Sequence, residues 1–187
     1  MHVAALDACV LFPNILRDSL LTLAEQDLFR PMWSTAILGE VRRNVLAKRD
    51  VDPAAIDRTP ALMTSVFDGA MIDDADWWPL VAGLELPDPD DRHVLAAAIA
   101  GGAEINRHLQ REGLPAARLA PHHIGAVHPD TFLLDQLDLA PAKILATLHR
   151  QAHRFRKPPM DLSGLLTRLE HCGVQDFVEE VRRSVAL

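Results

Sequence analysis

The chain of 187 residues is long enough for one well-filled domain, or for one domain with a small helical appendage. Hydrophobic residues make up 49% of the sequence and charged residues 24%, which excludes a disordered or fibrous protein. The formal net charge of −7 argues against a protein that coats nucleic acid non-specifically, because such binding needs many Lys and Arg contacts with phosphate. This charge does not exclude a nuclease, since carboxylates that hold a cation add negative charge themselves.

The sequence contains no membrane segment and no secretory signal that we recognise. Its longest apolar runs, such as residues 94–100, are far shorter than the ~20 residues that cross a bilayer. The N-terminus lacks the basic region, apolar stretch and cleavage site of a signal peptide. Cys9 and Cys172 belong to no Cys-x-x-Cys pair, which argues against a disulfide framework or a zinc ribbon. We therefore expect a cytoplasmic protein with no membrane contact.

The chain opens with a pattern typical of a buried strand followed by a helix. Residues 2–6 are apolar and end at Asp7, and from Pro13 onward apolar residues recur at helical spacing. Further along, Ser34 has the side chain of an N-cap and stands directly before a helical pattern over residues 35–48.

The middle of the chain continues this alternation. Asp52 and Pro53 predict the start of a helix that Pro60 breaks or kinks. A strong helix is expected after Leu86, ending before Gly101 and Gly102. Further short strands are expected at residues 70–72, 103–105 and 124–127. Strands that alternate with helices predict an α/β fold with a largely parallel sheet and helices on both faces.

The character of the sequence changes after residue 128. Only helices are predicted from there on, at residues 129–137, 141–155, 163–171 and 175–185, separated by Pro and Gly. We therefore divide the chain into a domain over residues 1–130 and a C-terminal helical extension over residues 131–187.

Acidic residues occupy positions where an α/β protein binds ligands. Asp7 follows the first strand, and ligands of open parallel sheets lie beyond the carboxyl ends of the strands. An alternative is that Asp7 only caps the next helix. Asp88, Asp90 and Asp91 cluster at a helix start, where structural capping is equally open. Asp91 is in line with the apolar stripe of its helix, so its carboxylate should point inward and need a cation.

Three segments together resemble the PIN-domain nucleases, especially the VapC-type toxins of bacterial toxin–antitoxin pairs. The segments are Leu6-Asp7-Ala8-Cys9-Val10-Leu11, Ser34 through Glu40-Val41-Arg42-Arg43, and Asp88-Pro-Asp-Asp-Arg-His-Val-Leu-Ala-Ala-Ala98. They stand in the family's order and span about residues 3–130. The later helices resemble the C-terminal extension of a longer subgroup of these toxins.

The resemblance implies a PIN-like three-layer sandwich in which acids converge on Mg²⁺ or Mn²⁺. The family's positions fall here on Asp7, Glu40 and Asp91, with Asp88 as a further candidate ligand. Spacing alone would leave Glu40 a surface residue. The family also has a fourth acid in a Thr-x-Asn-x-x-Asp stretch, and here the expected Asp falls on Gly113. The candidates to take over the roles of this stretch are Glu112 and Asn106.

The activity implied by the resemblance is metal-dependent cleavage of RNA to leave a 5′-phosphate and a 3′-hydroxyl. Hard cations such as Mg²⁺ prefer carboxylate oxygens, which agrees with the acidic set. The candidates for contact with the RNA phosphates are Arg42, Arg43, Arg92 and Asn106. The expected partners are RNA and a cognate antitoxin with a DNA-binding domain, and homodimers are common in the family.

Three alternatives stay open at this point. Because Gly113 replaces an acid, the chain is alternatively a catalytically weakened PIN-fold binding module or scaffold. A DNA-directed flap or repair nuclease of the same superfamily is a second alternative, which the compact size disfavours. A third alternative is a transition-metal site. Two sets of histidines have a spacing suitable for metal ligands, His122, His123 and His128 in one set and His149 and His153 in the other.

Overall fold

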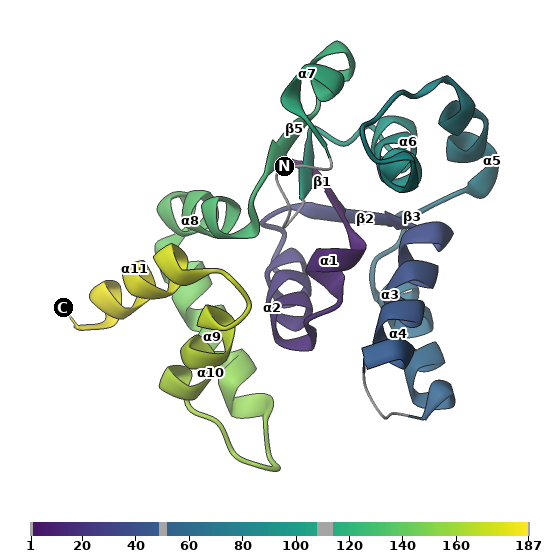
Figure 1. Ribbon diagram of the computed structural model, residues 1–187. Coiled ribbons are helices and arrows are strands. Elements are labelled where there is room, and N and C mark those ends of the chain that lie inside the picture. Colours follow the sequence, from purple (N-terminus) through teal and green to yellow (C-terminus); the bar gives the residue numbers. More distant parts are fainter. Residues whose placement is uncertain (1, 49–51, 108–113, 187) are drawn as a thin grey trace.

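A parallel sheet of five strands forms the centre of the molecule (Figure 1). The computed structural model describes residues 2–48, 52–107 and 114–186. The strands run in the order β3-β2-β1-β4-β5, and all neighbouring pairs are parallel. Their bounds are Val3–Leu6 for β1, Arg30–Ser34 for β2, Met71–Ile72 for β3, Ile105–Arg107 for β4 and Gly125–Val127 for β5.

The strand order places a topological switch point beside β1. The chain leaves β1 for β2 and β3 on one side, and then crosses to β4 and β5 on the other. Ala4, Ala5 and Leu6 of β1 are buried, as expected for a central strand of a sheet covered on both faces. Ligands of such sheets bind at the carboxyl end of the strands where the order reverses, and here that place is taken by Asp7.

Helices cover both faces of the sheet, which confirms the predicted three-layer α/β fold. In Figure 1, α2 and α3 lie on one side of the sheet and α6 on the other. The helices of this part are α1 (Ala8–Leu11), α2 (Asn14–Ala24), α3 (Thr35–Lys48), α4 (Pro53–Val66), α5 (Asp74–Trp77), α6 (Arg92–Ala100) and α7 (Ala116–Leu119), with short 3₁₀ turns η1 (Trp78–Gly83), η2 (Pro89–Asp91) and η3 (Ala120–His122).

The end of α6 lies tightly against side chains of β2 and β3. A Cβ atom built on Gly101 would lie 1.6 Å from the terminal methyl carbon of Met32 and 2.8 Å from Cδ1 of Ile72. Gly101 also ends the helix, and its amide bonds back to the carbonyl of Ala97. This contact holds α6 against the sheet and thereby fixes the direction in which the start of α6 points.

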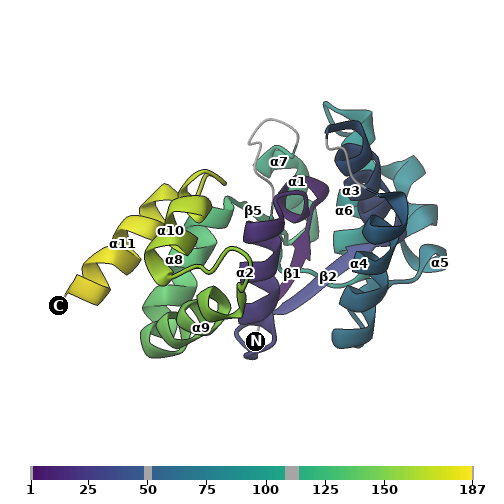
Figure 2. The same cartoon turned by 90° about the horizontal axis from the view of Figure 1, so that it is seen from below.

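The last part of the described chain is a bundle of four helices that packs against α2. These helices are α8 (Pro129–Leu139), α9 (Pro141–Arg154), α10 (Leu162–Glu170) and α11 (Gln175–Ala186). Both ribbon views place them beside α2, with α3 and α4 on the far side of α2 (Figures 1 and 2). A buried hydrogen bond of 2.9 Å from Ser19 Oγ in α2 to Gln151 Oε1 in α9 joins the two parts.

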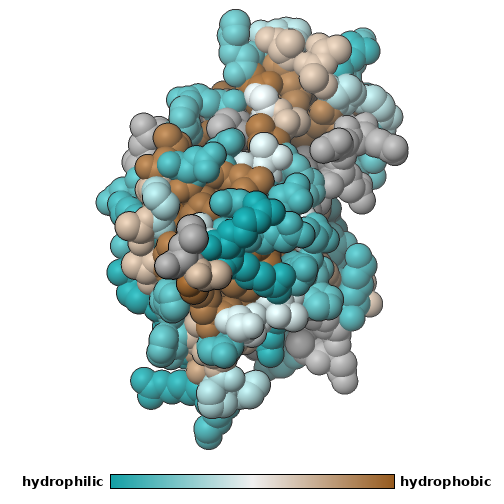
Figure 3. All heavy atoms as spheres, turned by 90° about the vertical axis from the view of Figure 1, so that its left-hand side faces the viewer, coloured by the Kyte–Doolittle hydropathy of each residue, from teal (hydrophilic) through white to brown (hydrophobic). Residues whose placement is uncertain are grey.

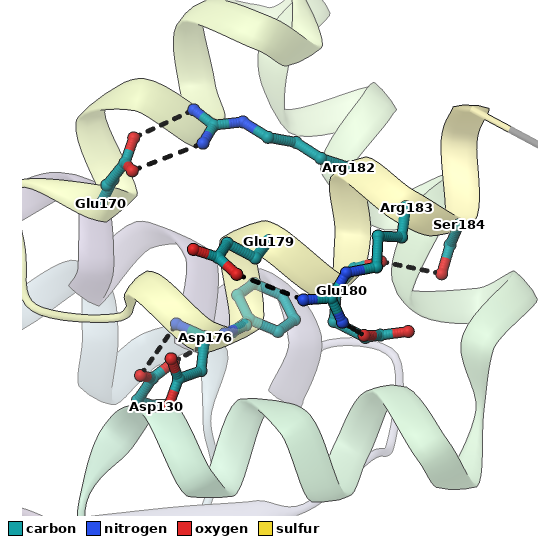
Figure 4. Close-up of polar contacts among 9 residues, drawn as sticks. Asp130, Glu170, Asp176, Glu179, Glu180, Arg182, Arg183 and Ser184 are labelled. Carbon is teal, nitrogen blue, oxygen red and sulfur yellow. Dashed lines mark hydrogen bonds and ion pairs between the residues drawn. The ribbon is translucent and has the colours of Figure 1, made fainter.

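The bundle is held by apolar packing and by a buried carboxylate. Asp130 of α8 accepts hydrogen bonds from the backbone amides of Asp176 and Phe177, where α11 begins (Figure 4). The outer face of the bundle mixes hydrophilic and hydrophobic side chains (Figure 3), and Leu139 and Val185 are among its exposed apolar residues.

The sequence predicted most elements within a few residues, but it missed strand β2 and the short helices α1, α5 and α7. Strand β2 was not expected, because Pro31 lies within it and its residues do not alternate in polarity. The short helix α1, capped by Asp7, also precedes the helix that was expected from Pro13. Of the predicted break or kink at Pro60, the break is wrong, because Pro60 lies inside α4 without ending it. Across the described ranges, no helix combines the length and apolar character that a bilayer crossing requires.

Candidate active site

A cleft of about 810 Å³ opens between the end of β1, the part of α3 from Glu40 to Lys48, and the start of α6. It is lined by side chains from α1, α3, η2 and α6 and from the turns beside them: Asp7, Cys9, Phe12, Pro13, Glu40, Arg43, Asn44, Lys48, Asp88, Asp90, Asp91 and His93. The predicted acids at positions 7, 40, 88 and 91 therefore share one hollow, although they come from separate parts of the sequence.

Asp7 is held rigidly at the floor of this cleft. Its side chain is only 3% exposed. One carboxylate oxygen accepts a hydrogen bond of 2.5 Å from the amide of Ala8, and the thiol of Cys9 donates to the other oxygen at 3.2 Å. Asp7 is thus the N-cap of α1, as the structural alternative expected, and it lines the acidic cleft as well. A buried carboxylate in such a place is stabilised by positive charge.

Glu40 lies one helical turn into α3 and faces a histidine that the sequence analysis did not single out. Its Oε2 is 3.5 Å from Nε2 of His93. The other ring nitrogen, Nδ1, is 2.6 Å from the carbonyl oxygen of Asp90. Because a carbonyl only accepts, Nδ1 carries a proton and donates it there. The separation from Glu40 is long for a hydrogen bond, so the contact with Glu40 is chiefly electrostatic.

The surroundings of His93 raise its pKa above the ordinary value. Burial is the largest single influence and lowers the pKa, but it is outweighed by the contact with Glu40, the hydrogen bond to the Asp90 carbonyl and the negative charges of Glu40 and Asp7. When protonated, the ring neutralises part of the negative charge that the acids bring together. The cleft favours cations.

The three aspartates before α6 have different roles. Asp88 caps the short turn η2, since its Oδ1 accepts a hydrogen bond of 2.9 Å from the amide of Asp90. Asp91 occupies the N-cap position of α6, but its side chain makes no capping hydrogen bond to that helix. Asp91 is half-buried and lines the cleft. The helix therefore does not use the Asp91 carboxylate for its own cap.

The chemistry of this cleft suits a hard divalent cation, because its ligand atoms are carboxylate oxygens. Within residues 2–48, 52–107 and 114–186, however, no group of three or more His, Cys, Asp and Glu side chains is close enough to hold a metal ion. The described acids thus share a cleft but not a closed ligand shell. Glu112, the predicted replacement for the fourth acid, lies outside the described residues.

The predicted phosphate-binding residues are distributed differently. Arg43 lines the acidic cleft. Arg42 points to a neighbouring groove and pairs with Asp57 of α4 at 2.6 Å. Arg92, in the first turn of α6, is half-buried and is not among the residues that line the cleft. Asn106 lies in β4, where its backbone pairs with Ala5 of β1, and its side chain lies outside the described part of the structure.

Six residues that line the cleft were not predicted as site residues from the sequence: Cys9, Phe12, Pro13, Asn44, Lys48 and His93. Asn44 and Lys48 follow Glu40 at steps of four residues, which places all three on one face of the helix. Their presence in the cleft could therefore have been predicted once Glu40 was assigned to it. His93 follows Asp91 by two residues and carried no comparable signal, because its contact with Glu40 exists only in the folded chain.

Two of the histidines considered for a transition metal, His128 and His153, have other partners. Nδ1 of His128 accepts a hydrogen bond from the amide of Asp130 and so caps α8. Nδ1 of His153 is 2.7 Å from the carbonyl oxygen of His149, one turn earlier in α9. These contacts explain both residues as parts of helices.

Two family models match separate ranges of the chain. A family model described as PIN domain matches residues 4–105, and a model described as VapC50 C-terminal domain matches residues 129–183. A protein named "Putative ribonuclease VapC50" from Mycobacterium tuberculosis (strain ATCC 25618 / H37Rv) is 39% identical over 93 residues, which are 50% of this chain and 54% of that protein. The chain thus aligns with about half the length of this curated relative. No solved structure matches the chain.

Proposed function

Because the chain belongs to the PIN domain family, we propose that it is a metal-dependent endoribonuclease of the VapC type that acts in the cytoplasm. One observation carries the proposal. Acids from the end of β1, from α3 and from the start of α6 line one cleft at the switch point of the sheet. The match of residues 129–183 to the VapC50 C-terminal domain adds support for the longer VapC subgroup.

In this proposal Asp7, Glu40 and Asp91 hold the metal ion, and Asp88 and Glu112 are further candidates. Asp7 suits the role because its buried carboxylate is fixed by the amide of Ala8 and the thiol of Cys9. Glu40 and Asp91 stand on α3 and before α6, so the packing of these helices sets how far the acids are apart.

When bound, Mg²⁺ or Mn²⁺ supplies a water of lowered pKa and a positive charge beside the scissile phosphodiester. The chain's own residues position the RNA. Arg43, at the edge of the cleft, is placed to hold a phosphate, whereas Arg42 is paired with Asp57 outside it. His93 faces Glu40, and this contact is one of the causes that raise the pKa of His93, so Glu40 stabilises the protonated form of the ring.

The proposed partners are an RNA substrate and a cognate antitoxin that carries a DNA-binding domain. A free ribonuclease of this type would need restraint in the cell. An Arg or Lys side chain inserted by the antitoxin would suit the acidic cleft, because charge-assisted hydrogen bonds to carboxylates are strong. A homodimer follows from the family resemblance alone.

The direct test is cleavage of a structured RNA with Mg²⁺ or Mn²⁺, before and after chelation with EDTA. We expect cleavage only with metal. Asp7→Asn and Glu40→Gln should each reduce the rate at least about 100-fold, since even outer-shell changes at metal sites cost about 10- to 100-fold. Asp135→Asn, an exposed change on α8, is the control and should cleave normally. Equal cleavage by wild type and Asp7→Asn would refute the proposal.

A second candidate function is a PIN-fold binding module without catalysis. It is favoured by the observation that no three described acids or histidines are close enough to hold a metal ion. No cleavage with any divalent ion, together with tight binding of RNA or of an antitoxin, would support this module. A parallel digestion of flap DNA separates both candidates from a DNA-directed nuclease.

A further inference from the structure

The acidic cleft has a second, basic end that the metal site does not explain. Glu40, Asn44 and Lys48 follow one another on α3 at steps of four residues, so they form one stripe along the helix. All three line the cleft. Since a helix rises 1.5 Å per residue, Lys48 stands about 12 Å along the axis from Glu40. The cleft therefore runs from carboxylates at one end to an ammonium group at the other.

Arg43 places a second positive charge between these ends. A Cβ atom built on Gly39 would lie 3.6 Å from a terminal guanidinium nitrogen of Arg43. The guanidinium thus leans back along α3 toward its N-terminus, the direction that helical side chains favour. It lies near the turn that carries Glu40, while Lys48 remains at the distal end. Two cations spaced along a groove match a chain of phosphates better than a single anion.

The wall opposite Lys48 is aromatic. Phe12, directly after α1, is half-buried and lines the cleft together with Pro13. The ammonium group of Lys48 lies 5.2 Å from the centre of the Phe12 ring. An exposed cation–π contact is weaker than the stacking of a base on an aromatic ring. A nucleotide can therefore displace Lys48 from the ring and take the ammonium group as a partner for its phosphate.

We propose that Phe12 and Lys48, aided by Arg43 and Asn44, form a subsite for an unpaired RNA nucleotide that flanks the scissile phosphate. The base stacks on Phe12, and Lys48 holds a phosphate of the same strand. This inference rests on the proposed ribonuclease function of the acidic end. The subsite accepts only an unpaired nucleotide, because the bases of a duplex are stacked on one another and cannot reach a ring.

The test measures binding without cleavage. Full-length protein in EDTA is titrated into a short fluorescein-labelled single-stranded RNA of mixed sequence, and anisotropy gives the affinity. Phe12→Leu keeps the apolar bulk and removes the aromatic face. We expect it to weaken binding of the single strand about 5- to 100-fold, the range that follows from the loss of one stacked base. Binding of a duplex of the same sequence should not change.

Lys48→Gln tests the phosphate contact without touching the core, since Lys48 is exposed. It should weaken binding and lower the salt dependence of the affinity by about 0.7 in log–log slope, the value for one phosphate of a single strand. Lys48→Arg should retain most of the affinity. The matched control is Lys143→Gln, an exposed lysine on α9, which should leave affinity and slope unchanged.

The outcomes separate this subsite from the proposed function. If wild type cleaves RNA with Mg²⁺ but Phe12→Leu and Lys48→Gln bind the single strand as wild type does, the subsite is refuted and the nuclease stands. Equal weakening of single strand and duplex by Phe12→Leu would refute base stacking. If the variants weaken only a protein partner and not RNA, the surface belongs to that partner and the subsite is refuted. Failure of wild type to bind or cleave RNA would overturn both proposals.

Discussion

Replacing Asp130 by Ala should loosen the C-terminal bundle, because this buried carboxylate is the cap of another helix. Asp130 stands in the first turn of α8 and is 8% exposed. Its oxygens accept hydrogen bonds of 3.1 Å from the amide of Asp176 and 2.8 Å from that of Phe177, at the start of α11 (Figure 4). The first amides of a helix have no partner within it, and its positive dipole end favours an anion.

The size of the effect follows from these contacts. A hydrogen bond to a charged group contributes about 1.5–3 kcal/mol, and the helix dipole adds about 0.3–1 kcal/mol. Water can replace the hydrogen bond that the backbone amide of Asp176 loses, because Asp176 is exposed. We therefore expect Asp130→Ala to lower the free energy of unfolding by about 3 kcal/mol. For a chain of this size that corresponds to a fall in melting temperature of about 6–12 °C.

The assay is thermal unfolding followed by circular dichroism at neutral pH, with Asp135→Ala as control. Asp135 lies on the same helix but is exposed, so its removal should change stability by no more than about 0.5 kcal/mol. Amide hydrogen exchange gives a local readout, and protection should fall first at Phe177. If Asp130→Ala melts within about 2 °C of the control, the contribution of this cap is below about 1 kcal/mol and the reasoning is wrong.

Three further predictions concern the sheet and the cleft. The pKa of His93 is raised, so its contribution to stability is present at acidic pH and is lost as the pH rises through that pKa. In an NMR titration, Glu40→Gln should lower the pKa of His93, because it removes the charge that faces the ring. An unchanged pKa would contradict the pairing of His93 with Glu40. Gly101→Ala should lower the free energy of unfolding by about 1–3 kcal/mol in a denaturant titration, because the added Cβ meets the side chain of Met32. Adding Met32→Ala to this variant should recover part of the lost free energy. If the effects of the two substitutions are simply additive, there is no clash between the two side chains. Ser34→Ala removes the N-cap of α3 and should lower the free energy of unfolding by about 1 kcal/mol, whereas Ser34→Thr should lower it less. Equal melting temperatures for wild type and Ser34→Ala would argue against the cap.

Much of the fold was readable from local patterns. Ser34 and Asp52 each precede a helix that the structure confirms, because N-cap chemistry depends only on nearby residues. Strand β2 was not readable. Pro31 argues against a strand, and the buried side chains of this strand follow from its place between β1 and β3, which is a property of the whole fold.

The candidate site was readable only in part. Asp7 and Asp91 were suggested by their positions after a strand and before a helix, where ligands of such folds bind. Glu40 came from family resemblance alone, since helical spacing left it at the surface. The partnership of Glu40 with His93 joins residues of α3 and α6, and the contact of Lys48 with Phe12 joins α3 to the end of α1. No local pattern records contacts between elements so far apart in sequence.

The central claim is that Asp7, Glu40 and Asp91 hold one divalent cation in the shared cleft. Calorimetric titration of Mn²⁺ into the chelator-treated full-length protein tests it most directly, with Asp91→Ala as the variant and Asp135→Ala as the matched control. We expect saturable binding to wild type and to the control, and loss of that binding in Asp91→Ala. Binding of Mn²⁺ to Asp91→Ala with wild-type affinity and stoichiometry would contradict the claim.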